Sequence, residues 1–182
     1  ASANSMMYCG MTPRFADIDP RTYNVTPATL AERVGPSTRL LLPVHFAGQP
    51  CDMESIGALA KERWLRVVED AAHAIGSAYR NGYKVGSCRH SDLTTFSFHP
   101  VKTVTTCEGG AITTNDDGLY ERLLLLRSHV AGSAHDLAGL GEFRRSLICS
   151  ARPSPFSRFG VHGWTGVAGL VHNFRQTEVG NL

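Results

Sequence analysis

The stretch Leu65-Arg-Val-Val-Glu-Asp-Ala-Ala-His73 begins as a short, branched, apolar run and ends in polar residues. Brief runs of this kind predict a buried strand of a parallel sheet, here over residues 65–69. Asp70 would then lie at the carboxyl end of the strand, where open α/β sheets build their ligand sites. A carboxylate buried there needs a cation or hydrogen-bond donors opposite it. Capping of a following helix by Asp70 is the alternative interpretation.

Short apolar runs and amphipathic stretches flank this strand on both sides. Further strands are predicted over residues 39–44, 92–98 and 110–114, and helices over 52–64 and from 115 or 116 to about 127. The dipeptide Asn81-Gly82 predicts a tight turn. This alternation is typical of βαβ units. We therefore predict an α/β fold, a three-layer α/β/α sandwich with a mainly parallel sheet.

The composition narrows the possible functions. The chain has 182 residues, of which 42% are hydrophobic, which is enough for a packed core. Its net charge of +2 argues against a dedicated nucleic-acid or membrane-surface protein. No apolar run approaches the roughly 18 residues of a membrane span, and no signal peptide is visible at the amino terminus. Five widely spaced cysteines without a CxxC pair favour reduced thiols and a cytoplasmic location.

Common site signatures are missing from the sequence. The histidines form no HxH or HxxxH pair that would supply metal ligands from one element, so no metal site is predicted. No glycine-rich nucleotide fingerprint and no Ser-His-Asp order stand out either.

A second informative stretch is Phe96-Ser-Phe-His-Pro-Val-Lys-Thr-Val-Thr-Thr-Cys-Glu-Gly-Gly110, which contains one of only three lysines. Val101 and Val104 flank Lys102, and we expect them to desolvate its amine and favour the neutral, nucleophilic form. Lys61 lies among charged residues and Lys84 follows a turn, so a Schiff base would form at Lys102. Taken alone, a solvated loop lysine is the alternative.

Together these stretches resemble the DegT/DnrJ/EryC1/StrS family of pyridoxal-phosphate-dependent sugar aminotransferases. The resemblance rests on Glu-Asp-Ala-Ala-His-Ala at 69–74, Phe-Ser-Phe-His-x-x-Lys at 96–102 and Glu-Gly-Gly at 108–110, and it covers residues 1–129. It extends to Tyr8-Cys-Gly-x-Thr-Pro13 and to Pro43-Val-His-Phe-Ala-Gly-Gln-Pro-Cys-Asp-Met53. Within the family, the chain is most similar to the branch that aminates UDP-linked 4-keto-6-deoxy N-acetyl sugars on the way to pseudaminic acid.

The resemblance implies a role for each matched position in binding pyridoxal 5′-phosphate (PLP). Asp70 would pair with the pyridine nitrogen of the cofactor, and His73 would hydrogen-bond its phenolic oxygen. Ala72 would pack against one face of the ring, and Ser97 would donate a hydrogen bond to the phosphate. Lys102 would carry the cofactor covalently and then act as the acid–base of the reaction.

The resemblance also implies a partner subunit. His172-Asn-Phe-Arg-Gln-Thr177 is similar to a family motif whose asparagine reaches the cofactor phosphate across a dimer interface. Asn173 would therefore serve the site of a neighbouring copy, and a homodimer or other self-association is expected. A generic surface loop is the alternative for this short match.

Three departures from the family pattern bear on the domain organisation. Residues 1–129 match the core of a PLP-binding large domain of fold type I, whereas 130–182 form an irregular segment that ends in the Asn-Phe-Arg motif. The amino-terminal phosphate-binding segment and the carboxyl-terminal small domain of the family are expected to be absent. Cys107 stands where the family has glycine, so a positive φ at this position would be strained.

Two functions follow from these observations. In the first, the chain is an aminotransferase that moves an amino group, with glutamate as the expected donor, to a nucleotide-linked 4-keto-6-deoxy sugar in surface-glycan biosynthesis. In the second, it is a truncated, catalytically incompetent remnant that binds PLP weakly or only contacts another subunit. Neither function involves a nucleic acid or a membrane.

Overall fold

The computed structural model describes residues 1–127. The expected irregular segment over 130–182, including Asn173, lies outside these residues. Among the described residues, no helix is long and apolar enough to cross a membrane.

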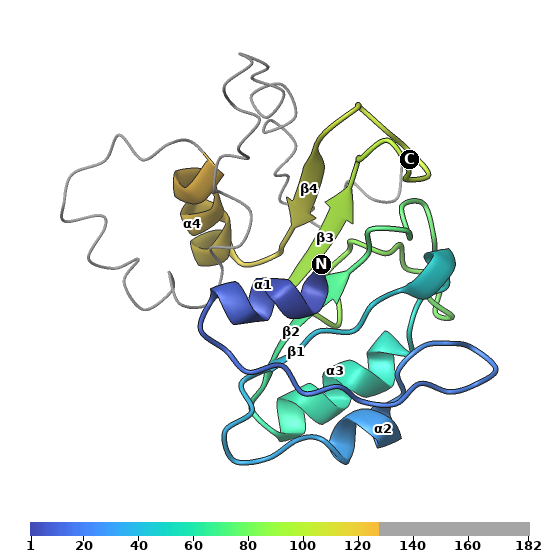
Figure 1. Cartoon of the computed structure of the whole chain (residues 1–182), viewed down its shortest axis with the longest axis vertical. Helices are drawn as coiled ribbons and strands as arrows, with labels where there is room; N and C mark the ends of the chain where they lie inside the picture. The colour runs from blue at the N-terminus through green and yellow to red at the C-terminus, as the bar shows by residue number, and fades with distance from the viewer. Residues whose placement is uncertain (128–182) are drawn as a thin grey trace.

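A four-stranded mixed sheet forms the centre of the described part (Figure 1). The strands are β1 (Leu40–Leu41), β2 (Arg66–Asp70), β3 (Leu93–Ser97) and β4 (Gly110–Thr113), in the spatial order β1-β2-β3-β4. β1 and β3 both pair with β2 in parallel, whereas β4 pairs with β3 in antiparallel orientation. The prediction of an α/β fold is confirmed, and the sheet is parallel except at the β4 edge.

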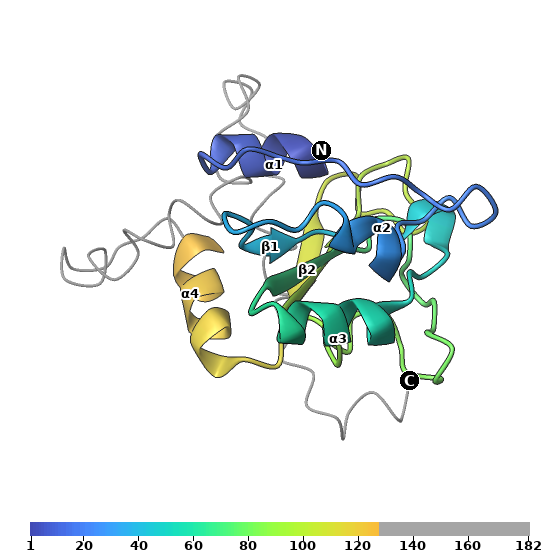
Figure 2. The same cartoon turned by 90° about the horizontal axis from the view of Figure 1, so that it is seen from below.

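Helices cover both faces of this sheet. α1 (Ser2–Tyr8) and α3 (Met53–Glu62) lie on opposite sides of β1 and β2 (Figure 2). The remaining helices are α2 (Pro27–Ala31), the single 3-10 turn η1 (Phe46–Gly48) and α4 (Asp117–Arg127). Helices therefore lie on both sides of β1 and β2, in keeping with the predicted α/β fold.

α3 buries one apolar face and carries its own start signal. The side chain of Asp52 accepts a hydrogen bond from the backbone N–H of Ser55, which satisfies one free donor of the first turn. Met53, Ile56 and Ala60 recur at helical spacing and are buried against Leu41 and Val67 of the sheet. Burial of such side chains stabilises the fold by roughly 1.5–3 kcal/mol each for the larger residues.

Two predicted boundaries were wrong for local reasons. The strand predicted over 39–44 is only two residues long, because Pro43 has no N–H to donate to a neighbouring strand, although Val44 still bridges Asp70. The helix predicted to reach Trp64 ends at Glu62, and Trp64 adopts a left-handed conformation with φ of 55°. Neither difference alters the order of the elements.

Four strand ends, and the three connections that start from them, meet at one edge of the sheet. The carboxyl ends of the parallel strands β1, β2 and β3 and the amino end of the antiparallel strand β4 all lie there. The residues that follow β2 and β3, including His73 and Lys102, therefore start from the same edge. This is the position at which open α/β sheets bind ligands.

Several residues in the connections between the strands have positive φ angles. Cys107 has φ of 70°, which confirms the strain expected for a side chain at this position. Gly86 has φ of 94°, and a Cβ built there would lie 2.8 Å from the ring of Phe96. Gly82, in the Asn81-Gly82 turn, has a similar φ of 85° but has no atom within 4 Å of a built Cβ.

We predict that Gly86→Ala destabilises the chain much more than Gly82→Ala. Both alanines carry the cost of a positive φ, about 1 kcal/mol, but only Gly86→Ala also forces a methyl group into the Phe96 ring, which adds about 1–3 kcal/mol. Urea unfolding of the two variants measures the difference. Equal losses of stability would contradict the contact between Gly86 and Phe96.

Candidate active site

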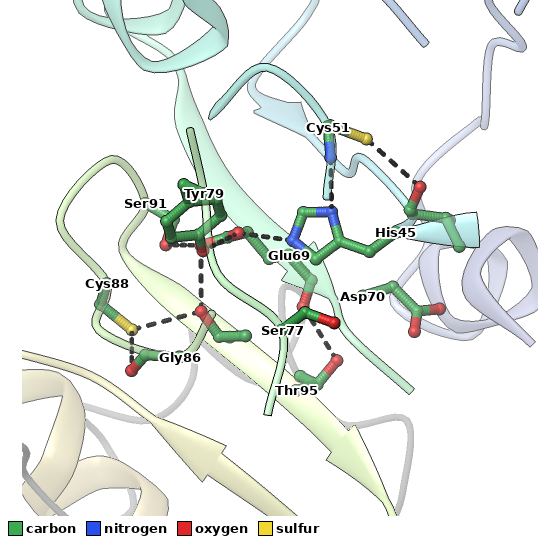
Figure 3. Close-up of polar contacts among 12 residues, drawn as sticks. His45, Cys51, Glu69, Asp70, Ser77, Tyr79, Gly86, Cys88, Ser91 and Thr95 are labelled. Atoms are coloured by element: carbon green, nitrogen blue, oxygen red, sulfur yellow. Dashed lines mark hydrogen bonds and ion pairs between the residues drawn. The ribbon is translucent and has the colours of Figure 1, made fainter. Parts of the chain in front are cut away.

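A fully buried carboxylate, that of Glu69, connects the strands beneath the candidate site. Its Oε2 accepts hydrogen bonds from Nε2 of His45 at 2.7 Å and from the hydroxyl of Tyr79 at 2.6 Å. Its Oε1 accepts hydrogen bonds from the hydroxyls of Ser91 and Thr94. Figure 3 shows His45, Tyr79 and Ser91 approaching Glu69 from different segments of the chain. Four donors thus replace the water that this carboxylate loses on burial.

The tautomer of His45 follows from its partners. Nδ1 accepts a hydrogen bond from the backbone N–H of Cys51, so Nε2 carries the ring proton and donates it to Glu69. The backbone N–H of His45 also donates to the carbonyl of Asp70 at 3.0 Å. His45 therefore ties the segment after β1 to the end of β2 through both its ring and its backbone.

The electrostatics keep each member of this network in its hydrogen-bonding form. Burial raises the pKa of Glu69, but the hydrogen bonds from His45, Ser91 and Tyr79 outweigh it and hold the pKa below its ordinary value of 4.5. Burial and the nearby Glu69 charge raise the pKa of Tyr79, so its phenol stays protonated and donates. The same two causes raise the pKa of the Cys51 thiol to about 12.

Asp70 points to the opposite side of β2 from Glu69 (Figure 3), as alternation along a strand requires. The carboxylate is half-buried and accepts hydrogen bonds from the hydroxyl of Ser2 and from the backbone N–H of Ala72. No helix begins directly after Asp70, since residues 71–77 form turns, so the helix-cap interpretation was wrong. The carboxylate instead accepts a hydrogen bond from the backbone N–H two residues on and closes a turn. No Lys, Arg or His within residues 1–127 forms an ion pair with Asp70.

The structure brings Lys102 and His73 together. Nζ of Lys102 lies 2.8 Å from Nε2 of His73, although 29 residues separate them in the chain. The expected desolvation of Lys102 by its neighbours was wrong, because Val101 is 79% exposed and Val104 is 47% exposed. Lys102 as a residue is half-buried, its contact with His73 is exposed, and the amine is positioned by the imidazole and not by an apolar pocket.

The turn that carries His73 packs against Gly48, the last residue of η1. Ser77 donates a hydrogen bond to the carbonyl of Gly48 at 2.7 Å. Gly48 has φ of 86°, and a Cβ there would lie only 2.9 Å from the carbonyl oxygen of His73. Close approach of the two backbones therefore requires glycine at position 48.

The other candidate residues lie at the same edge. Ser97 is the last residue of β3, is half-buried, and accepts a hydrogen bond from the backbone N–H of His99. Ala72 is half-buried between Asp70 and the exposed His73. Asn173 lies outside the described residues. The described candidates thus all follow or end β2 and β3.

Sequence reasoning missed the Glu69 network and the contact of Ser2 with Asp70. The only signal for the network was a charged residue at an inward position of a predicted buried strand, two residues after Val67. A charge at such a position is almost always paired or fully hydrogen-bonded. Nothing local to residues 1–8 indicated a partner 68 residues away.

The arrangement combines an amine, a carboxylate and a hydrogen-bonding imidazole ring. The amine of Lys102 is nucleophilic when neutral, and His73 offers it a hydrogen-bond partner. Asp70 offers a carboxylate to a cationic or N–H group at the same sheet edge. Within the described residues, no cluster of three or more His, Cys, Asp or Glu side chains forms a metal-binding group.

Comparison with known proteins gives a consistent set of relatives. Residues 1–141 match the DegT/DnrJ/EryC1/StrS aminotransferase family. A GDP-perosamine synthase from Caulobacter vibrioides is 51% identical over 127 residues, which cover 70% of this chain and 33% of that protein. The spore coat polysaccharide biosynthesis protein SpsC from Bacillus subtilis is 43% identical, with 71% of this chain and 32% of that protein covered.

Solved structures agree with these relatives. DesI, determined with its TDP-sugar product, superposes with a TM-score of 0.67 at 38% identity, covering 76% of this chain and 33% of that chain. Helicobacter pylori PseC, an aminotransferase of pseudaminic acid biosynthesis, superposes with a TM-score of 0.62 at 39% identity. The match covers 66% of this chain and 31% of the PseC chain. The chain spans about a third of the length of the curated relatives named above, 33% and 32%.

We predict that Glu69→Gln costs about 2–4 kcal/mol of unfolding free energy near pH 7. An amide cannot accept four hydrogen bonds, and its NH₂ group would face a donor. Because the folded-state pKa of Glu69 lies below 4.5, its contribution is present above that pH and is lost as the pH falls through the folded pKa. The difference in unfolding free energy between the variant and the unsubstituted chain should therefore become smaller below pH 4.5.

Urea unfolding at several pH values between about 3 and 7 measures this gap. Glu54→Gln, at an exposed carboxylate in the first turn of α3, is the matched control and should cost less than about 0.5 kcal/mol. A gap for Glu69→Gln that is small or independent of pH would contradict the role of the network.

Proposed function

The chain belongs to the DegT/DnrJ/EryC1/StrS aminotransferase family, whose members are PLP-dependent, and from this membership we propose that it provides the lysine-bearing part of a PLP-dependent sugar aminotransferase. The observation that carries the proposal is the contact between Lys102 and His73, 2.8 Å long, at the sheet edge where Asp70 ends β2. Residues 1–129 would form the core of a large domain of fold type I.

The donor set at this edge fits PLP. Asp70 is a carboxylate without a cationic partner among residues 1–127, which suits the protonated ring nitrogen of the cofactor. Lys102 would bind the cofactor covalently, His73 would face its phenolic oxygen and Ala72 one face of its ring. Ser97 would donate a hydrogen bond from its hydroxyl to the phosphate.

Each residue then has a defined task in the reaction. PLP, when bound, supplies an electron sink that stabilises negative charge at the Cα of the amino donor. The carboxylate of Asp70 would keep the ring nitrogen protonated, and Nζ of Lys102 would take the proton from Cα of the amino donor and deliver it to C4′ of the cofactor. His73, which already contacts Nζ, orients this amine.

The relatives support a proposal for the substrate class. We propose a nucleotide-linked 4-keto-6-deoxy sugar as the acceptor and glutamate as the amino donor. Two relatives act in the synthesis of different sugars: the GDP-perosamine synthase at 51% identity, and PseC, of pseudaminic acid biosynthesis, at 39% identity. The proposal therefore extends to the nucleotide-sugar class and does not single out the pseudaminic acid branch. A role in polysaccharide biosynthesis is in keeping with the relative SpsC.

The remainder of the site would come from outside the described residues. We propose that the chain acts as a homodimer in the cytoplasm and that Asn173 reaches the cofactor phosphate of the neighbouring subunit.

We predict that PLP followed by borohydride labels Lys102 about tenfold more than Lys61 or Lys84. Binding of the cofactor by Asp70 and Ser97 would raise its concentration near Lys102, whereas Lys61 is exposed on α3 and the amine of Lys84 donates to the carbonyl of Gly76. Peptide mass mapping of the reduced protein locates the label.

Lys102→Ala should abolish the preferential label, and Lys61→Ala serves as the control that leaves it unchanged. Label spread evenly over the three lysines would contradict an organised cofactor site and favour a remnant without catalytic function.

A further inference from the structure

Both oxygens of the Asp70 carboxylate have defined partners. Oδ2 accepts a hydrogen bond from the hydroxyl of Ser2 at 2.5 Å, and Oδ1 accepts one from the backbone N–H of Ala72 at 3.1 Å. One donor is thus local to the turn after β2, and the other comes from the first turn of α1, 68 residues away. The plane of the carboxylate is fixed from both sides.

We propose that Ser2 is a positioning residue for Asp70, which it holds so that the carboxylate faces a protonated ring nitrogen. This inference rests on the proposed function, because the ligand of Asp70 is taken to be PLP. Ser2 acts through Asp70, and no contact of its own with the cofactor is required.

The placement of α1 supports a role beyond packing. α1 has no buried residue, so its contribution to the hydrophobic core is small. It nevertheless lies across the sheet face opposite α3, on the side to which Asp70 points (Figures 2 and 3). The hydroxyl of Ser5 donates to the carbonyl of Ser2 at 2.6 Å, which braces the first turn that presents the Ser2 side chain.

The chemistry favours a hydroxyl over a cation at this position. A lysine or arginine paired with Asp70 would neutralise the carboxylate and compete with the ligand. A serine donates a single neutral hydrogen bond, which orients Oδ2 and leaves the negative charge available. Each carboxylate oxygen has two lone pairs, so Oδ2 can bind Ser2 and still accept an N–H group from a ligand.

The test compares PLP with its 1-deaza analogue, in which a C–H group replaces the ring nitrogen. Dissociation constants are measured by absorbance for the 182-residue chain and its Ser2→Ala, Ser2→Thr and Asn4→Ala variants. Asn4 is exposed on the same helix and provides the matched control. Borohydride labelling of Lys102 by each ligand verifies that both occupy the same site.

We expect Ser2→Ala to weaken binding of PLP about fivefold and binding of the deaza analogue less than about twofold, since only PLP uses the carboxylate of Asp70. Ser2→Thr keeps the hydroxyl and should restore the affinity for PLP, and Asn4→Ala should leave both ligands unaffected. A purely structural role of Ser2 would weaken both ligands equally.

Equally weakened binding of both ligands in Ser2→Ala, or no change in the binding of either, would overturn the role of Ser2. Borohydride label on Lys102 would in that case still support the proposed function. Failure of the unsubstituted chain to bind PLP or to be labelled at Lys102 would overturn the proposed function and this inference together.

Discussion

The buried carboxylate of Glu69 is the constraint on which the rest of the structure depends. It is fully buried and accepts hydrogen bonds from His45, Tyr79, Ser91 and Thr94, which come from three separate segments of the chain. A buried charge of this kind is costly unless every donor is in place. Stabilisation of this carboxylate therefore requires that the segment after β1, the turn beyond β2 and the start of β3 all adopt their native positions at the same time.

The orientation of the candidate site follows from this constraint. Because Glu69 must face inward, the next residue, Asp70, must face the other side of the sheet. The same His45 that donates to Glu69 also binds the carbonyl of Asp70, and Gly48 of the adjoining turn packs against His73. The anionic part of the site thus rests on a rigid network, whereas Lys102 is presented by an exposed hairpin connection that includes the strained Cys107.

Local patterns in the sequence were sufficient for the central elements. β2, β3 and α3 were predicted because apolar spacing, and for α3 the Asp52 cap, agree with the tertiary structure. α1 and α2 are too short to give a periodic signal, and the antiparallel direction of β4 is decided by pairing with β3. Desolvation of Lys102 was predicted from its neighbours in the chain, but its actual partner, His73, is 29 residues away. Contacts across such distances depend on the fold and have no local signature.

The central claim is that the edge organised by Glu69 binds PLP between Asp70 and Lys102. The most direct measurement is a crystal structure of the 182-residue chain after treatment with PLP and borohydride. We expect continuous density between Nζ of Lys102 and C4′ of the cofactor, with the ring nitrogen within hydrogen-bond distance of the Asp70 carboxylate. Cofactor bound to Lys61 or Lys84, or a ring nitrogen facing away from Asp70, would contradict the claim.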